Sequence, residues 1–368
     1  MTTLPVTTAR LESATRAQVR AHKRRRARVF ALLMALCAAA FLLSLTFGSV
    51  SIPVRDVLAA LTGQATERAS WTVIVVDYRL PKALTALLAG AALGVSGLMM
   101  QTLFRNPLAD GYVMGVSSGA SLGVALVVLG GGVGSTTLLS GLSLAGDVGV
   151  VTAAATGAAL VMALIFVLSR RLRHVTALLI VGLMLGYAVS AIVSLLAHFT
   201  IPERLQAYTN WTFGSFGDTT NGQLVLFALV VAAGMGLALV SAKPLNGLLM
   251  GEDTARGLGI RVRRTRVLVM LGAALLAGAV TAFCGPVGFL GIAVPHICRT
   301  LLKTSDHLIL FPASALLGGI LAVSADIIAQ APGLDIVLPL NAVLALFGAP
   351  VVLWIVLRRG SLMRGSML

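Results

Sequence analysis

Ten separate apolar runs, each close to the length of a membrane-spanning helix, constrain the fold of this 368-residue chain more than any other feature. They lie at 29–47, 83–103, 113–131, 148–168, 176–197, 223–241, 267–284, 287–301, 309–328 and 338–357. A spanning helix takes about 20 apolar residues, and none of these stretches alternates like a barrel strand. The sequence therefore predicts an all-α polytopic membrane protein with about ten transmembrane helices. Charged residues make up only 11% of the chain, against about 25% in soluble domains, which excludes a soluble fold.

The distribution of basic residues predicts the orientation of the chain in the membrane. The net charge is +15, from 28 Lys and Arg against 13 Asp and Glu. If the N-terminus lies inside, all but five basic residues fall on the inner side of the ten segments. Those five are Arg55, Arg68, Arg79, Lys82 and Arg204. Since Lys and Arg concentrate on cytoplasmic loops, we expect both termini in the cytoplasm, and the basic surplus requires no nucleic-acid partner.

The same pattern divides the chain into two tails and one membrane domain. We expect a basic cytoplasmic tail at 1–28, a ten-helix domain at 29–358 with its longest inner loop at 243–266, and a cytoplasmic tail at 359–368. A cleavable signal peptide is the alternative for the first apolar run, because Cys37 and the alanines after it supply small residues. The run continues beyond them to a full spanning length, which favours a retained helix.

An internal similarity indicates a possible repeat. The run Leu87–Ala91 recurs 188 residues later as Leu275–Ala279, and Gly97 and Pro107 recur at the same displacement as Gly285 and Pro295. Five helices separate the two copies, and because five is odd, the copies would be inverted in the membrane, as helices 2–5 and 7–10. Chance identity in a chain rich in Leu, Ala and Gly remains the alternative.

Polar residues that interrupt the apolar background mark the candidate sites. Arg79 and Lys82 project positive charge from the outer side just before the second helix. They are candidates for docking a negatively charged partner surface, or for anchoring the helix end at the interface. Asp326 is the one carboxylate deep in a predicted helix. It must face the bundle interior or a partner, because a lipid-facing charge there costs about 3 kcal/mol.

Two further clusters lie on the inner side. The first contains Asn106, Pro107, Ser117 and Ser118, where irregular backbone either lines a pathway or forms a tight turn. The second lies in the loop 243–266, where an acidic and a basic residue four positions apart suit a short helix bounded by glycines. Such a helix is a rigid element on which another protein could act, and a solvated linker is the alternative.

Other chemistries lack their signatures. None of the four lysines follows a glycine, so the chain has no Gly-Lys-Ser/Thr phosphate loop. Cys37, Cys284 and Cys298 all lie in apolar runs without metal-ligand spacing. We therefore expect no catalytic residue, metal site or cofactor, and a transport process driven by an ion gradient or by a separate ATPase.

In order along the chain, the polar and glycine motifs resemble those of the FecCD family, the permease subunits of bacterial ABC importers for ferric siderophores, haem and cobalamin. The resemblance covers about residues 30–358. It rests on Arg79-Leu80-Pro81-Lys82, Gly90–Leu93, Ser96-Gly97, Gln101, Arg105–Ala109, Gly115–Ala120, Gly251-Glu252, Ala255, Leu258-Gly259, Gly285–Phe289, Pro295-His296, Arg299, Asp306-His307, Ala325-Asp326 and Gly348–Pro350.

The resemblance implies two ten-helix subunits around a central path, two cytoplasmic ATPases and an extracytoplasmic binding protein. The inner-loop helix would seat in an ATPase cleft, through Gly251, Glu252, Ala255, Arg256 and Gly259. Arg79 and Lys82 match positions that pair with glutamates of the binding protein, and the third basic position is Gln330 here. That departure suggests a heterodimer with a different permease, with a homodimer as the alternative. The family's cytoplasmic gate maps to Val175 and Thr176.

The substrate follows from one segment near the C-terminus. Leu338-Pro339-Leu340-Asn341-Ala342 resembles siderophore-uptake members more than cobalamin members, in which a glycine replaces Asn341. We expect a ferric siderophore to cross the bacterial cytoplasmic membrane, with haem or cobalamin as the alternative within the family. A gradient-driven secondary transporter and a non-transporting membrane scaffold are the alternatives from other classes.

Overall fold

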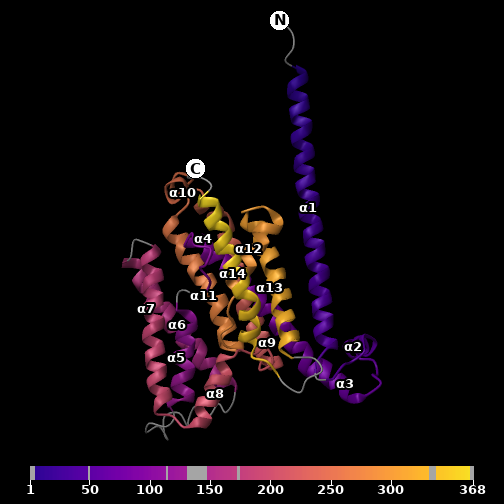
Figure 1. Ribbon diagram of the computed structural model, residues 1–368, viewed down its shortest axis with the longest axis vertical. Coiled ribbons are helices and arrows are strands. Elements are labelled where there is room, and N and C mark those ends of the chain that lie inside the picture. The colour runs from indigo at the N-terminus through magenta and orange to yellow at the C-terminus, as the bar shows by residue number, and fades with distance from the viewer. Residues whose placement is uncertain are drawn as a thin grey trace.

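The computed structural model describes residues 5–48, 50–112, 115–130, 147–171, 175–330 and 337–364, and these contain helices but no β-strand. Figure 1 shows the helices in their order along the chain. They are α1 (Pro5–Thr46), α2 (Val54–Leu61), α3 (Ala69–Val73), a π-helical turn (Ile74–Arg79), α4 (Leu80–Leu103), α5 (Val116–Val128), α6 (Asp147–Arg171), α7 (Val175–His198), α8 (Pro202–Thr212), α9 (Asn221–Leu249), α10 (Glu252–Gly257), α11 (Val262–Cys284), α12 (Leu290–Leu302), α13 (His307–Ala329) and α14 (Leu340–Arg364).

Each of the ten predicted apolar runs corresponds to one of these helices. Within the described ranges, seven helices are long and apolar enough to cross a membrane, namely α1, the unit of α3 and α4, α6, α7, α9, α11 and α13. The other three runs form the shorter apolar helices α5, α12 and the first part of α14. The prediction of an all-α polytopic membrane protein is therefore confirmed.

Two helices, α4 and α11, form the centre of the bundle. The most apolar window of α4 is 78% buried and that of α11 72%, whereas the window of α7 is only 11% buried. Small residues let α4 approach its neighbours closely, as expected for helices that pack in lipid. At Gly90 an added Cβ atom would lie 2.1 Å from the carbonyl oxygen of Gly318 on α13. The central helices are thus held by backbone contact and the outer helices present apolar side chains.

The contacts between helices agree with the predicted inverted repeat. In the repeat, α4 corresponds to α11, α5 to α12 and α6 to α13. The contact of α4 with α13 therefore corresponds to that of α11 with α6, and the contact of α4 with α12 corresponds to that of α11 with α5. The pairs α5 with α6 and α12 with α13 correspond in the same way. Gly90 faces Gly318 across the first interface, and Gly278, its counterpart in the repeated sequence, has Ala158 of α6 nearby across the second. The predicted transmembrane helices 2–5, which are α4 to α7, and 7–10, which are α11 to α14, therefore show matching arrangements.

Helices α5 and α12 are shorter than the predicted runs at 113–131 and 287–301. Each has 13 residues and spans about 20 Å, less than the roughly 30 Å hydrocarbon core. The segments before them enter the bundle instead of ending at its surface. The backbone N–H of Val287 donates to the Tyr112 hydroxyl at 3.3 Å. Pro107 and Pro286 lie in these segments, and proline ends a helix because it lacks an N–H donor.

The start of α1 and the end of α14 lie on one side of the bundle. In Figure 1 the N-terminal part of α1, the C-terminal end of α14 and helix α10 point to the same end, while α2, α3 and α8 lie at the opposite end. Residues 5–28 of the predicted basic tail belong to α1, which continues without a break to Thr46. The five basic residues that we assign to the outer side belong to the segment from α2 to the start of α4 and to α8.

Candidate functional sites at the two ends of the bundle

Helix α10 forms the short glycine-bounded element that the sequence predicts in the inner loop. Gly251 precedes it with φ of +112° and Gly259 follows it with φ of +80°, backbone conformations that other residues rarely adopt. The expected pair is present: the Arg256 guanidinium lies 3.5 Å from the Glu252 carboxylate and 3.0 Å from that of Asp253. The predicted loop 243–266 is shorter than expected, because α9 continues to Leu249 and α11 begins at Val262.

Helix α10 is fixed to the bundle on one side and exposed on the other. Glu252 also forms an ion pair with Arg266 of α11, and the Ala255 side chain is completely buried. Large apolar residues flank the helix, with Met250 before it 67% exposed and Leu258 after it 63% exposed. A firmly held helix with apolar residues beside it is a suitable surface for a partner protein.

A buried polar network, which sequence analysis missed, lies directly beside this loop. The Asn246 amide on α9 accepts hydrogen bonds from the His307 backbone N–H at 2.9 Å and from its ring Nδ1 at 2.6 Å. The other ring nitrogen of His307 is 2.8 Å from the Thr102 hydroxyl on α4. Asn246 also donates to Asp306 at 2.8 Å. Thr102 lies in a predicted apolar run, Asn246 in the predicted inner loop and His307 between two runs, so no pattern in the sequence connected these three distant positions.

At the opposite end of the bundle, Lys82 and Asp326 form a partly buried ion pair. The Lys82 amino group lies 3.1 Å from the Asp326 carboxylate, and the two side chains are 25% and 8% exposed. Gln330 donates a second hydrogen bond to Asp326 at 2.8 Å. The sequence expectation that Asp326 needs the bundle interior or a partner is therefore met by Lys82 of α4.

Arg79 anchors the end of α1. Its guanidinium donates to the backbone carbonyls of Leu45 at 2.8 Å, Thr46 at 2.9 Å and Val50. These contacts fit the anchoring interpretation, since Arg79 satisfies carbonyls at a helix C-terminus. Arg79 and Lys82 both remain partly exposed at this end. They therefore lie where a binding protein could reach them, although each already has partners within the chain.

The pathway candidates belong to three separate segments of the chain, namely the turn after α4, the start of α5 and the start of α7. The Asn106 side chain accepts a hydrogen bond from the Leu108 backbone N–H at 3.0 Å, which is typical of a turn, and Pro107 and Ser117 are half-buried. Ser118 is also half-buried and lies beside Gly186 of α7. Val175 and Thr176 begin α7, but their side chains lie outside the described part of the chain.

Asn341, singled out above for its sequence context, connects the start of α14 to the end of α8 and to the turn between α11 and α12. Its amide N–H₂ donates to the carbonyl of Thr212, at the end of α8, at 3.0 Å and to that of Pro286. Its amide oxygen accepts from the Gly288 backbone N–H at 3.1 Å. The Asn341 side chain thereby pairs backbone groups of the turn between α11 and α12, which would otherwise lack a hydrogen-bond partner inside the bundle.

Helix α8 covers α5 at this end of the bundle. Its Tyr208 is half-buried, and burial raises the pKa of the Tyr208 phenol above its ordinary value while a hydrogen bond to Ser121 opposes that change. The phenol therefore stays neutral at physiological pH and fixes α8 by packing and hydrogen bonding.

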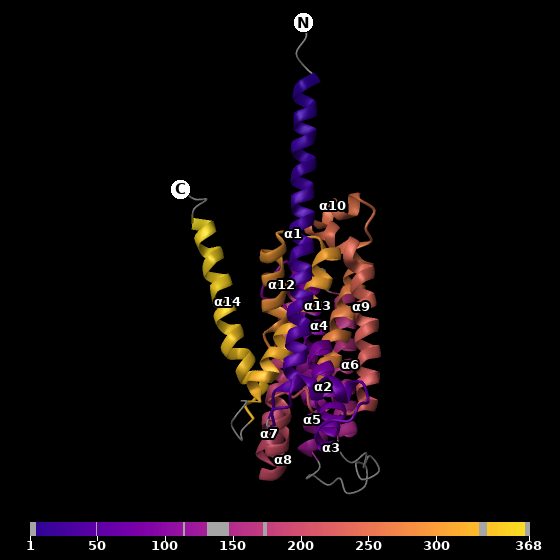
Figure 2. The same cartoon turned by 90° about the vertical axis from the view of Figure 1, so that its right-hand side faces the viewer.

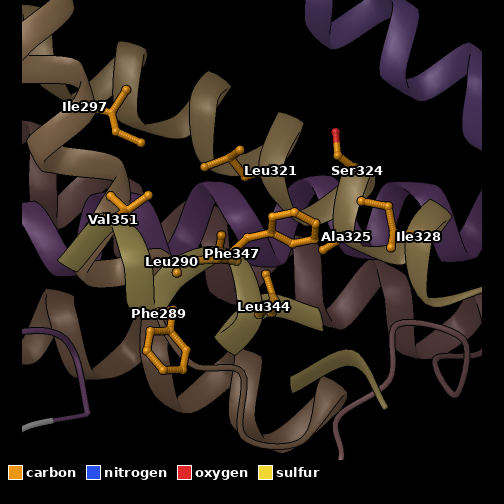
Figure 3. Close-up of a pocket in the computed structure, with 12 residues that line it drawn as sticks. Phe289, Leu290, Ile297, Leu321, Ser324, Ala325, Ile328, Leu344, Phe347 and Val351 are labelled. Atoms are coloured by element: carbon orange, nitrogen blue, oxygen red, sulfur yellow. The ribbon is translucent and has the colours of Figure 1, made fainter. Parts of the chain in front are cut away.

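An apolar cavity of about 240 Å³ lies between α12, α13 and α14. Figure 3 shows its lining, in which Ser324 is the only residue with a polar side chain, and Figure 2 shows α14 diverging from the bundle beside it. No predicted site residue lines this cavity. Its apolar surface suits hydrocarbon and not a hydrophilic chelate.

Within the described ranges, no group of three or more His, Cys, Asp or Glu residues could hold a metal ion.

Comparison with known proteins identifies the family. The model of the FecCD transport family matches residues 36–358 of the chain. The chain belongs to the FecCD transport family. The hemin transport system permease HmuU of Yersinia pestis is 33% identical over 86% of this chain and 91% of its own length. The vitamin B12 import system permease BtuC of Klebsiella pneumoniae is 35% identical over 91% of this chain and 95% of its own length.

A solved structure supports the same assignment. An inward-facing conformation of a putative metal-chelate type ABC transporter matches with a TM-score of 0.77 and 27% identity, covering 90% of this chain and 98% of that one. This FecCD chain is thus the permease subunit of an ABC importer, and hydrolysis of ATP belongs to a separate subunit. The gradient-driven transporter and the scaffold are no longer needed as explanations. The named relatives carry different substrates at similar identity.

Proposed function

We propose that this FecCD permease moves a ferric siderophore across the bacterial cytoplasmic membrane, driven by ATP hydrolysis in partner subunits. The observation that carries the ATP-driven part is helix α10, which is fixed to α11 through Glu252 and flanked by the exposed Met250 and Leu258. Helix α10 lies at the same end as the N-terminal part of α1. Because basic residues concentrate near this end, we assign it to the cytoplasm.

Two kinds of partner bind at opposite ends. An ATPase seats α10, with Gly251, Glu252, Ala255, Arg256 and Gly259 setting its position. An extracytoplasmic siderophore-binding protein docks at Arg79 and Lys82, whose partial exposure supports this role. A second permease completes the path, and Gln330 in place of a basic residue favours a heterodimer over a homodimer. The apolar, mostly exposed surface of α7 is suited to membrane lipid or to that second subunit.

The choice of a siderophore rests on the segment around Asn341. The side chain of Asn341 holds the turn between α11 and α12 against the end of α8, and glycine at this position could make none of these side-chain bonds. The position that separates siderophore from cobalamin members in the sequence resemblance therefore shapes the outer end of the bundle. Haem and cobalamin remain the alternative substrates.

We expect a strain lacking this permease to lose iron uptake from one class of ferric siderophore. Uptake of ⁵⁵Fe from a panel of defined siderophores, with radiolabelled hemin and cobalamin as parallel arms, measures the loss. Re-expression of the full chain should restore the affected substrate alone. Loss and restoration of cobalamin or hemin uptake, with all siderophores unaffected, would refute the siderophore assignment and keep the importer assignment.

A second prediction concerns the ATPase contact. Replacing both Glu252 and Arg256 with alanine removes the ion pairs that fix α10, and should lower co-purification with the ATPase by about tenfold, as expected for central interface positions. The amount of permease in the membrane should not change. The matched control is Arg263→Ala, an exposed basic residue at the start of α11. Undiminished co-purification of the double variant would contradict the coupling role of α10.

A further inference from the structure

The inner polar network connects the coupling loop to a particular pair of helices. Asn246 lies on the last turns of α9, only a few residues before α10. His307 is the first residue of α13, and Thr102 lies on the last turn of α4. His307 and Thr102 are almost fully buried, with exposed fractions of 1% and 4%. The loop that carries α10 therefore meets α4 and α13 through one set of buried hydrogen bonds.

The hydrogen bonds of this network determine which atoms donate and which accept, including the position of the proton on the His307 ring. The Asn246 amide N–H₂ must face the Asp306 carboxylate, which only accepts. The Asn246 oxygen then accepts from the His307 backbone and from Nδ1, so the ring proton lies on Nδ1. Nε2 is left as an acceptor for the Thr102 hydroxyl. Every member is satisfied with His307 neutral, and a fully satisfied buried network is rigid.

A second contact joins the same loop to α4. The Arg105 side chain, just beyond the end of α4, donates to the backbone carbonyl of Leu248 at 3.1 Å. Leu248 lies one turn before α10. The end of α9 is thus held to α4 by Arg105 and to α13 by Asn246, and only Met250 and Gly251 lie between the end of α9 and α10.

Helices α4 and α13 are locked to each other along their length. An added Cβ atom at Gly90 would lie 2.1 Å from the Gly318 carbonyl oxygen, and one at Gly94 would lie 2.6 Å from that of Ser314. Backbones this close cannot slide without lateral separation. At the outer end Lys82 of α4 pairs with Asp326 of α13. The pair is therefore joined at the inner end, in the middle and at the outer end.

We propose that α4 and α13 form one strut that carries the movement of the ATPase-coupled loop to the outer docking end, with Asn246 and His307 as the positioning residues at its inner end. The proposal rests on the proposed function for the role of α10. Over its 24 residues α4 spans about 36 Å, so the strut reaches from the inner network to Lys82. Movement of α10 shifts Lys82 and Asp326 as a unit, because they lie on two helices that contact each other at the inner end, in the middle and at the outer end.

The test compares Asn246→Ala with wild type in the reconstituted full importer. We expect unchanged assembly and ATP hydrolysis, but uptake reduced on the order of tenfold, the size typical of a lost coupling contact. Thr102→Val, which keeps the side-chain shape, should give a smaller reduction of the same kind. Asn210→Ala, an exposed asparagine on α8, is the matched control. Wild-type uptake in Asn246→Ala, or loss of assembly together with uptake in both variants, would overturn the proposal.

A partner-free measurement separates this proposal from the assignment of α10. In the purified permease, hydrogen exchange in the first turn of α13 should accelerate at least about tenfold in Asn246→Ala, while exchange around Gly90 and Gly318 stays slow. Unchanged exchange at α13 would overturn the strut. Accelerated exchange in Asn246→Ala, together with a separate finding that the wild-type permease binds no ATPase, would leave the strut intact and refute the proposed function.

Discussion

Replacing Gly90 with alanine should destabilise this FecCD permease by about 3 kcal/mol, at the upper end of overpacking effects. The new methyl group would overlap the Gly318 carbonyl oxygen, and the obstacle is backbone, so no side-chain rotation can relieve it. Helix α4 and helix α13 would have to separate. The measurement is the midpoint of thermal unfolding in detergent, followed by the loss of the monodisperse peak in size-exclusion chromatography.

The matched control for this prediction is Gly236→Ala on α9. Gly236 lies in a helix interior with no atom within 4 Å of an added Cβ atom, so alanine there should stabilise the helix by about 0.5–1 kcal/mol. Gly318→Ala should reproduce the loss seen at Gly90, because it meets the Gly90 carbonyl from the other side. If Gly90→Ala and Gly236→Ala unfold at the same temperature, the close approach of α4 and α13 is wrong.

The apolar runs predicted the helices because crossing a membrane leaves the backbone no alternative to helix. They could not predict where a helix begins within a run. Residues 285–289 continue the apolar character of α11 and α12, yet the chain there is non-helical and bonded to Asn341 and Tyr112. The glycines and prolines in these segments were visible signals, but hydropathy alone cannot tell a turn at the surface from one inside the bundle.

Local spacing predicted one ion pair and missed another. Glu252 and Arg256 are four residues apart, so helix geometry alone brings them together. The partner of Asp326 was not predictable in the same way, because Lys82 lies on a helix far away in sequence and meets Asp326 only when α4 packs on α13. The need for a partner followed from the cost of a buried charge, whereas its identity required the tertiary structure.

The partly buried ion pair of Lys82 and Asp326 gives the second large expected effect. Lys82→Met keeps much of the side-chain length but leaves the Asp326 carboxylate without its cation. Breaking a buried pair by removing one partner costs about 3–5 kcal/mol, and because Lys82 is 25% exposed, we expect about 3 kcal/mol. The loss appears as a lower unfolding midpoint of the purified permease. Arg204→Met, which changes a basic residue of α8 at the same end of the bundle, should leave the midpoint unchanged.

Adding Asp326→Asn to Lys82→Met decides what Lys82 does. The double variant removes the orphaned charge and keeps the hydrogen-bonding shape for Gln330, so it should recover most of the lost stability, as a double-mutant cycle reports for groups in direct contact. Capture of the binding protein should stay low in the single and in the double variant if Lys82 also docks that partner, since neither variant restores the positive charge. Recovery of both stability and capture would show that Lys82 acts only through Asp326, as an internal anchor of α4 on α13.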